Sequence, residues 1–308
     1  PATLMLIAHV EQEGVWSLAG GMQSLAAGLE KVARSCGVSF RYGHWVEEIG
    51  TGRGRVTSVR TGDGEEIACD TVVCSADPGA LRAGLLGEAA QRAVSRRPGC
   101  ERSLSAVTWA GTARLSGMTP DFHSVFLSGD YAAEFQALDQ ARCLPDEPTV
   151  YLCAPDRLAT GERGAGGAER VFCLVNAPAD GDIHEYSAEE IAACEQRMLR
   201  KLDTCGLSLE FERKGLVTRT PTDFENRFPG TGGAIYGQAT HGWSAAFRRP
   251  GSRSRLPGLY LAGGGVHPGA GVPMVAISGS LAADAVLADR ALTNRWWPTA
   301  TAGGTSMP

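Results

Sequence analysis

Apolar residues at helical spacing mark the first element that the sequence predicts, over residues 20–36. Side chains three or four positions apart form one apolar face there, at Met22, Leu25, Leu29, Val32 and Cys36. Gly37 follows at the position where a glycine commonly ends a helix. The pattern therefore predicts an amphipathic helix that ends at this glycine.

Short runs rich in β-branched residues continue the chain as far as Ala76. They read "VSFRYG", "HWVEEI", "RVTSVRT" and "DTVVCSA", with the turn "GDGEE" before the last of them. Gly and Asp-Gly punctuate such runs where strands turn. This order predicts a strand, a small antiparallel excursion, and a buried strand that ends at Ala76.

The middle of the chain has longer alternating runs, which predict a large antiparallel sheet. These runs are "SLSAVTWAGTARL", "HSVFLSG", "TVYLCAP" and "ERVFCLVNAP". Ser187 and Glu190 then have the spacing of a helix capping box. A helical stripe follows, which we interpret as core packing, at Ile191, Cys194, Met198, Leu202 and Cys205.

The C-terminal part returns to a strand, turn and helix pattern. "GLYLAGG" predicts a buried strand, "PMVAISGSLAADAVLAD" predicts a helix, and the glycine-rich "LAGGGVHPGAGVPM" (261–274) joins them. Such a turn brings unpaired N–H groups and the positive end of a helix dipole to one point, which suits an anionic or electron-rich group. It also suits a plain tight turn, because "GAGVPM" has Met274 where the G-x-G-x-x-G dinucleotide fingerprint has its last glycine.

Composition and charge limit the class of protein. The chain has 308 residues, 43% of them hydrophobic, which is enough for one or two globular domains. A net charge of −5 with scattered arginines argues against nucleic-acid binding. The 9 cysteines form no C-x-x-C pair, which favours buried thiols in a reducing compartment. No apolar run is expected to reach the length of a transmembrane helix, and no signal peptide is evident.

Few residues have the pattern of polar catalysts or metal ligands. No H-x-x-x-H or paired carboxylates with ligand spacing occur, so we predict no metal centre. His267 could orient a substrate or move a proton, although a loop-filling role is slightly favoured. His241 and Tyr236 could line a substrate channel. The other histidines are isolated, and we expect them to be structural or solvated: His9, His44, His123 and His184.

The C-terminal run as a whole resembles a known family signature. The run "GGAIYGQATHGWSAAFRRPGSRSRLPGLYLAGGGVHPGAGVPMVAISGSLAADAVL" is similar to that of the carotenoid desaturases of the phytoene desaturase type, which are FAD flavoproteins allied to amine oxidases. Within them it looks most like the 1-hydroxycarotenoid 3,4-desaturases, also called methoxyneurosporene dehydrogenases. The run "GVWSLAGGMQSLAAGLEKVARSCGVSFRYGHWVEEI" also looks like this family's helix-strand unit, which "VVCSADP" closes.

The resemblance implies a set of cofactor-binding residues for FAD. Val46 is implied to contact the adenine end, and Gly263 and Gly264 to lie at the ribityl-diphosphate. Val272, Pro273 and Met274 are implied to bring the last helix to the flavin ring. Members of this family begin with a strand and a G-x-G-x-x-G turn that the 308 residues lack, and the chain starts at Pro1. We therefore expect a C-terminal fragment, inactive on its own.

The same resemblance implies the fold class and the domains. We expect a mixed α/β chain with part of a Rossmann-like FAD-binding domain and an antiparallel substrate sheet. Residues 17–79 and 257–292 are expected to form the FAD-binding part, and 80–256 the substrate-binding domain. Residues 1–16 are expected at an edge of the substrate domain, and 293–308 as a tail.

The implied function is FAD-dependent desaturation of an acyclic 1-hydroxycarotenoid at its C3–C4 bond, by hydride transfer to the flavin. The implied partners are the carotenoid, a cytoplasmic membrane surface with peripheral attachment, and an electron acceptor that the sequence does not identify. Two alternatives stay open. One is another flavin-dependent polyene oxidoreductase, such as a phytoene desaturase, a carotenoid isomerase or a retinoid-type reductase; the other is a non-catalytic lipid-binding remnant.

Overall fold

The computed structural model describes residues 12, 14, 16, 18–95, 102–159, 167–239 and 249–296. The chain divides into two compact units, Pro1–Trp45 and Val46–Pro308. The smaller unit holds helix α2 (Met22–Ser35), and Gly37 ends this helix with a positive φ of 86°. The sequence prediction of this helix and its glycine end is confirmed, although the helix buries none of its residues.

The prediction of a strand at "VSFRYG" is wrong. Residues 38–43 form turns and irregular backbone. A β-branched run becomes a strand only when another strand pairs with it, and the described residues of this unit supply no such partner.

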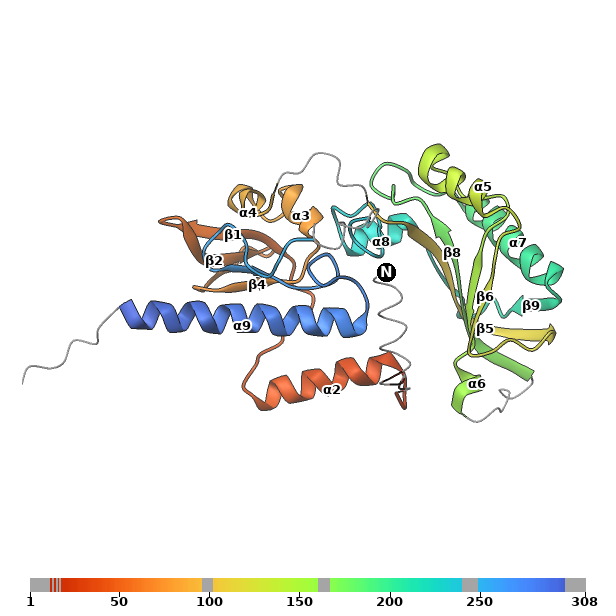
Figure 1. Ribbon diagram of the computed structural model, residues 1–308, viewed down its shortest axis with the longest axis horizontal. Coiled ribbons are helices and arrows are strands. Elements are labelled where there is room, and N and C mark those ends of the chain that lie inside the picture. The colour runs from red at the N-terminus through yellow and green to blue at the C-terminus, as the bar shows by residue number, and fades with distance from the viewer. Residues whose placement is uncertain are drawn as a thin grey trace, which may run out of the picture. The chain divides into compact units, whose positions relative to one another are not determined.

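The described residues of the larger unit form three sheets (Figure 1). The first is antiparallel, in the order β1 (Val46–Gly52), β2 (Arg55–Thr61), β3 (Glu66–Ala68), which confirms the small antiparallel excursion. The second is a parallel pair of β4 (Val72–Cys74) and β11 (Leu259–Leu261), in which Val73 lies opposite Tyr260. β11 is buried throughout, whereas Val73 of β4 is 49% exposed, so the expectation of a fully buried strand at "DTVVCSA" is corrected.

The third sheet has six strands, in the order β10-β5-β8-β7-β6 with β9 also pairing with β5. These are β5 (Ser105–Gly117), β6 (His123–Phe126), β7 (Val150–Cys153), β8 (Ala168–Ala177), β9 (Leu207–Phe211) and β10 (Val217–Arg219). All of its pairings are antiparallel, so the large antiparallel sheet that the sequence predicts is confirmed.

Helix α7 (Ala188–Thr204) covers one face of this sheet, and its start is fixed by the predicted capping box. Ser187 Oγ accepts the Glu190 N–H, and the Glu190 carboxylate accepts the Ser187 N–H. Cys194, Met198 and Leu202 of this helix are buried against alternate sheet residues that include Trp109, Leu152 and Val175. Figure 1 shows α5 (Tyr131–Gln136) on the same side, where a π-helical turn (Ala137–Ala141) extends it.

A second core lies around the parallel pair. Leu259, Leu261 and Val266 pack there with Ile49 and Val56 of the three-stranded sheet. Helices α3 (Pro78–Arg82) and α4 (Glu88–Ala93) add further buried side chains to this second core, Leu81, Ala90 and Ala93. Residues 80–94 thus pack with the parallel pair, although the sequence reasoning placed them in the substrate-binding domain.

Helix α9 (Val272–Trp296) runs along the parallel pair (Figure 1). Ser278, Ala282 and Ala285 are its buried residues on that side. Further along, the Asp289 carboxylate accepts the Tyr260 hydroxyl at 2.9 Å and pairs with Arg253 at 3.0 Å. Small residues near the start of α9 and polar contacts near its end therefore hold it beside β11.

Helix α9 also contains a stretch that meets the length and composition of a membrane span. This stretch, Val272–Ala291, has a mean hydropathy of 1.4, and 17% of it is buried. Among the described residues this helix is the one candidate, and the sequence expectation named none. One helix of this kind is weak evidence for a span, because length and composition alone also admit other helices.

Two short helices complete the described elements. They are α6 (Asp156–Ala159) and α8 (Pro221–Arg227). Thr220 caps α8 by a capping box with Asp223, and Pro221 occupies its first turn. Helix α8 lies where the six-stranded sheet leads back toward the parallel pair (Figure 1).

Candidate functional site

The parallel pair brings two chain segments to one edge. Because β4 and β11 run in the same direction, the segments that follow Cys74 and Leu261 leave the sheet on the same side. The Ala262 N–H donates to the Cys74 carbonyl oxygen at 3.0 Å and continues the pairing into the glycine-rich turn. In open α/β sheets, the carboxyl ends of strands are where ligands bind.

Gly263 begins this turn in a conformation that favours glycine. Its φ is 112°, and a Cβ there would lie 3.3 Å from the Ser75 carbonyl oxygen. Its N–H donates to the buried Ser278 hydroxyl at 3.1 Å. The start of the turn is therefore fixed both to the segment after β4 and to helix α9.

Gly265 packs just as closely and was not singled out from the sequence. A Cβ at Gly265 would overlap Asp77 and the ring of Pro78. Asp77 caps helix α3 by accepting the Gly79 N–H at 2.7 Å. The "VVCSADP" segment and the glycine-rich turn thus form one packed loop pair.

The first turn of α9 presents backbone donors without helical partners. The Val275 N–H donates to the Gly271 carbonyl oxygen at 2.9 Å, so the N–H groups of Val272 and Met274 precede the first such bond. Pro273 between them has no N–H. No acidic residue lies in this turn to offset the positive end of the helix dipole. These residues fit an anionic or electron-rich group, such as part of FAD.

Arg249 ties the glycine-rich turn to the segment that follows the large sheet. Its guanidinium donates to the carbonyl oxygens of Gly264 at 2.6 Å, Tyr236 at 3.0 Å and Gln238 at 3.3 Å. Burial lowers the pKa of Arg249, and the nearby Asp77 carboxylate acts in the opposite direction. Sequence reasoning missed this residue, because nothing in "FRRPGSR" shows that its partners are carbonyl groups far along the chain.

The implied cofactor residues fall into two groups. Gly263, Gly264 and 272–274 lie together on the turn and helix start. Val46 begins β1 in the three-stranded sheet, where it pairs with Thr61. His267 lies in the turn, and its side chain lines a pocket of about 560 Å³ with Arg253 and Asp284.

Two further sequence candidates have different outcomes. Tyr236 is 54% exposed. Its backbone N–H donates to the Ser103 hydroxyl at 3.1 Å. His241 lies outside the described residues.

The face of the six-stranded sheet opposite α7 is mainly apolar, and its exposure rises from the buried Thr108 on β5 to the exposed His123 and Val125 on β6. The strand register places alternate residues of four strands there: Thr108, Ala110, His123, Val125, Tyr151, Cys153, Phe172 and Leu174. Phe172 and Leu174 are half-buried, and Val125 is 57% exposed. We call these eight residues the open sheet face.

One hydrogen-bonded pair interrupts the apolar character of the open sheet face. The Tyr151 hydroxyl and His123 Nδ1 are 2.6 Å apart. Burial raises the pKa of Tyr151 to about 12, with smaller contributions from Cys153 and Tyr236. Two neighbouring strands bring Tyr151 to His123, and this contact between strands could not be read from the sequence.

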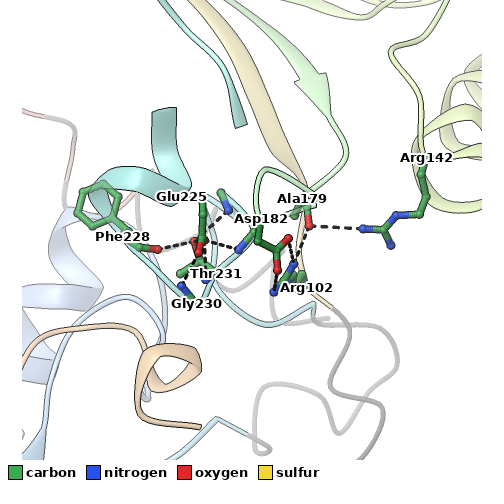
Figure 2. A network of polar contacts seen from close by, with 10 residues as sticks. Arg102, Arg142, Ala179, Asp182, Glu225, Phe228, Gly230 and Thr231 are labelled. Carbon is green, nitrogen blue, oxygen red and sulfur yellow. Dashed lines mark hydrogen bonds and ion pairs between the residues drawn. The ribbon is translucent and has the colours of Figure 1, made fainter. Parts of the chain in front are cut away.

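A polar junction lies between the large sheet and the parallel pair (Figure 2). The Glu225 carboxylate accepts the N–H groups of Gly230, Thr231 and Gly232 at 2.7 to 3.0 Å. Beside it, Arg102 forms a two-pronged ion pair with Asp182 at 2.6 and 2.7 Å. These bonds fix the loops through which the chain passes from one core toward the other.

Cysteine and metal chemistry add little to this site. The eight described cysteines are free thiols, and Cys36, Cys143 and Cys205 among them are exposed, so the expectation of buried thiols holds for only part of the set. Across the described ranges, no three His, Cys, Asp or Glu side chains gather in a way that could hold a metal ion.

Comparison with known proteins gives one family and several relatives. Residues 3–287 match the family described as flavin containing amine oxidoreductase. The chain is 48% identical over 306 residues to hydroxyneurosporene desaturase of Rubrivivax gelatinosus, covering 99% of this chain and 58% of that protein. It is 42% identical to hydroxyneurosporene desaturase of Rhodobacter capsulatus, covering 94% of this chain and 58% of that protein.

More distant matches include other carotenoid enzymes and one solved structure. The chain is 30% identical to 1-hydroxycarotenoid 3,4-desaturase of a Flavobacterium species, covering 93% of this chain and 58% of that protein. An oxidoreductase structure from Methanosarcina mazei matches with a TM-score of 0.48 and 17% identity, covering 87% of this chain and 54% of that one. The chain thus spans 58% of the length of these curated relatives.

Proposed function

Because the chain belongs to the flavin containing amine oxidoreductase family, we propose that it forms part of an FAD-dependent desaturase of acyclic 1-hydroxycarotenoids. Two relatives named hydroxyneurosporene desaturase and one named 1-hydroxycarotenoid 3,4-desaturase support the substrate class. The mixed helix and sheet fold is that of a flavoprotein with a parallel strand pair and a separate antiparallel sheet.

The glycine-rich turn at the end of β11 is the observation that carries this proposal. Its positive φ at Gly263 and the free N–H groups at the start of α9 suit close approach of the cofactor to the backbone. We assign Gly263 and Gly264 to the ribityl-diphosphate. We assign Val272, Pro273 and Met274 to the flavin ring.

Val46 completes the proposed set, at the adenine end. It is half-buried at the start of β1, and this strand also supplies Ile49 to the core that contains β11. Its carbonyl and N–H groups are the atoms we assign to contact with the cofactor. The catalytic base or acid of the reaction stays unassigned, and His267 is a weak candidate for it.

The reaction that we propose removes two hydrogens from the saturated C3–C4 bond of the carotenoid. When bound, FAD supplies the acceptor for the hydride, and the second hydrogen leaves as a proton. The chain's own part is to hold the polyene along the open sheet face and to exclude water from the reacting bond. Apolar side chains such as Phe172 and Leu174 suit that task.

The proposed domains follow the two cores. The FAD-binding part consists of 17–79 and 257–292, to which the packing of Leu81 and Ala90 adds residues 80–94. The rest of 80–256 forms the substrate-binding domain around the six-stranded sheet. Helix α9 continues to Trp296, so residues 293–296 of the expected tail are helical, and 297–308 lie outside the described residues. The place of 1–16 at an edge of the substrate-binding domain stays a proposal.

A carotenoid is too apolar to travel through water, so we propose that the protein takes it from the cytoplasmic face of a membrane to which it binds peripherally. The electron acceptor that reoxidises the cofactor is a further partner of this proposal. The sequence and the fold leave its chemical identity, oxygen or a quinone, to experiment.

The test is to express the complete gene product in membranes and to supply a hydroxylated acyclic carotenoid. We expect bound flavin and a product that has lost two hydrogens and absorbs at longer wavelength, because its conjugation is extended. A product that has gained oxygen would instead favour the activity named in a relative that is 32% identical, 4,4'-diapolycopene oxygenase of a Methylomonas species. Flavin-free protein that converts nothing would favour a lipid-binding remnant.

A further inference from the structure

The open sheet face is built as two rows of facing residues. One row runs Ala110, Phe172, Cys153, His123, and the other runs Thr108, Leu174, Tyr151, Val125. Adjacent residues of a row lie on neighbouring strands, about 5 Å apart. Tyr151 and His123 are therefore diagonal neighbours on this face, and they bring hydrogen-bonding groups to an apolar surface.

Aromatic contacts hold both rings of the pair in place. The rings of His123 and Tyr151 are stacked, with centroids 5.8 Å apart and an interplanar angle of 26°. Phe122 packs edge-on against His123 at 4.3 Å, and Phe172 packs against Tyr151 at 6.3 Å. The polar atoms of the pair are thus oriented by packing before any ligand arrives.

The pair retains unused hydrogen-bonding capacity. A phenol hydroxyl has one donor and two acceptor positions, and an imidazole has a second ring nitrogen. The bond of 2.6 Å uses Tyr151 Oη and His123 Nδ1, and Cys153 is a further hydrogen-bonding neighbour of the phenol. One phenol position is left, and among the described residues Nε2 of His123 has no hydrogen-bond partner. Together the two side chains can both donate to and accept from a neutral alcohol.

The charged side chains described on this side of the sheet are paired with one another and not with Tyr151 or His123. Each arginine that the register places there faces an acid: Arg170 pairs with Asp156, Arg219 pairs with Asp223, and Arg114 lies opposite Glu210. Tyr151 itself stays protonated, because burial raises its pKa to about 12. A neutral polar group therefore suits this position better than a carboxylate or an ammonium group.

The pair also lies toward the cofactor side of the sheet. Tyr236 is close enough to Tyr151 to contribute to the raised pKa of that phenol. The carbonyl oxygen of Tyr236 accepts a hydrogen bond from Arg249, which also bonds to Gly264 of the glycine-rich turn. Tyr236 therefore lies near Tyr151 and shares Arg249 with the glycine-rich turn.

We propose that Tyr151 and His123 bind the terminal hydroxyl group of the acyclic carotenoid and so select hydroxylated over non-hydroxylated substrates. This inference rests on the proposed function, and it adds the residues that determine substrate specificity. The apolar residues of the open sheet face bind the polyene without regard to its end group. The pair supplies the hydrogen bonds that a hydrocarbon end group cannot use.

The experiment compares Tyr151→Phe and His123→Phe with the unchanged complete gene product. Each variant keeps an aromatic ring and removes the hydrogen-bonding atoms. The substrates are a 1-hydroxylated acyclic carotenoid and its non-hydroxylated analogue of equal conjugated length. We expect the ratio of their kcat/KM values to fall about tenfold in each variant, as for the loss of one hydrogen bond to a substrate hydroxyl.

Tyr131→Phe is the matched control. Tyr131 is a 57% exposed tyrosine at the start of α5, outside the open sheet face. We expect this control to leave the substrate ratio unchanged. Thermal unfolding of all three variants checks the fold, and His123 is exposed, so its replacement tests the inference even if Tyr151→Phe proves unstable.

Binding to the purified protein, measured by the absorption of retained carotenoid, separates this inference from the proposed function. If the unchanged protein desaturates the hydroxylated carotenoid but neither variant changes the substrate ratio, the inference is overturned and the function stands. If the unchanged protein desaturates neither carotenoid, the proposed function fails. In that case the inference is tested by binding alone. If the unchanged protein binds the hydroxylated carotenoid more tightly than its analogue and both variants lose this preference, the inference is supported. If the unchanged protein shows no preference, the inference is overturned.

Discussion

The glycine-rich turn and the open sheet face use the chain in opposite ways. In the turn, residues close together in the chain act through backbone groups, and the critical features are a positive φ at Gly263 and the N–H groups of Val272 and Met274, which have no helical partner. On the open sheet face, side chains from four strands act together, and the backbone groups of these strands are hydrogen-bonded to neighbouring strands. A cofactor site of this kind can be recognised in a short stretch of sequence, whereas a substrate surface exists only after the strands have paired.

The two regions also have separate cores, and this gives the prediction with the largest effect. Leu152 lies in the core under the large sheet, and Leu261 lies in the core of the parallel pair. Both are fully buried, so Leu152→Ala and Leu261→Ala are each expected to cost about 2–5 kcal/mol of unfolding free energy. Urea unfolding, followed by fluorescence of the buried Trp109, measures the effect on the sheet.

Flavin content then distinguishes the two leucine variants. At low temperature, where both still fold, Leu261→Ala is expected to lose most of its bound flavin and Leu152→Ala to keep it. The same loss in both variants would show that the two cores behave as one cooperative unit, and it would remove the distinction between the two regions.

Gly263→Val tests the backbone character of the turn. A valine is strained at a φ of 112°, by about 1–3 kcal/mol, and its side chain would press on the Ser75 carbonyl. We expect flavin affinity to fall about 100-fold, which corresponds to the upper part of that range, while the large sheet still folds. Flavin content and circular dichroism of the purified protein measure the two effects.

Gly279→Val is the control for that substitution. Gly279 lies within α9 with open space where a Cβ would be, and its φ is not positive. Valine there meets no neighbouring atoms and has a slightly higher helix propensity than glycine, so we expect no loss of stability. If the Gly263 variant keeps as much flavin as this control, the turn is a structural feature and the cofactor assignment of 261–274 is wrong.

Sequence reasoning succeeded where structure depends on neighbours in the chain. The helix at 20–36, the capping box at Ser187 and the four long runs of the large sheet all carry local signals, and the structure confirms them. The strand expected at "VSFRYG" failed because pairing, and not propensity, decides whether such a run becomes a strand. Strands β9 and β10 were missed because they are short, at five and three residues.

In the candidate site, too, features that depend on neighbouring residues in the chain were predicted, and features that depend on distant residues were missed. The turn at 261–274 was found as one motif, and Gly263 proved to have the positive φ that such a motif needs. Arg249 was missed, because its three carbonyl partners lie 11 to 15 residues away. The Tyr151–His123 pair was missed as well, since it depends on the register of β6 against β7, which no local pattern specifies.

Arg249→Met tests how far the two regions depend on each other. The change removes a guanidinium that bonds to Gly264 on the cofactor side and to Tyr236 and Gln238 on the side of the sheet. We expect a loss of about 1–3 kcal/mol of unfolding free energy, because three carbonyl groups lose hydrogen bonds from one charged donor. Flavin content is expected to fall severalfold, as measured by absorption after gel filtration.

Two comparisons sharpen the Arg249 result. Arg213→Met removes an exposed arginine that pairs with Glu195, and such a pair contributes less than about 1 kcal/mol. Arg249→Lys keeps the charge but lacks the planar fork, so it is expected to restore only part of the flavin content. Full restoration by lysine would show that charge, and not the three-way hydrogen bonding, is what the turn needs.

The smallest effect is expected for His267→Ala, although His267 lies inside the glycine-rich turn. Its N–H donates to the Pro250 carbonyl oxygen at 2.9 Å, and alanine keeps that bond. Its side chain lines a pocket that is already open, so its removal leaves no buried cavity, and we expect a change within about 0.5 kcal/mol. Ser278→Ala is the contrast, because the buried Ser278 hydroxyl accepts the Gly263 N–H and its loss leaves that donor unpaired, at a cost of about 1–3 kcal/mol. Flavin content and thermal unfolding of both variants decide the matter: an effect of His267→Ala as large as that of Ser278→Ala would mean that side chains of the turn, and not only its backbone, hold the cofactor.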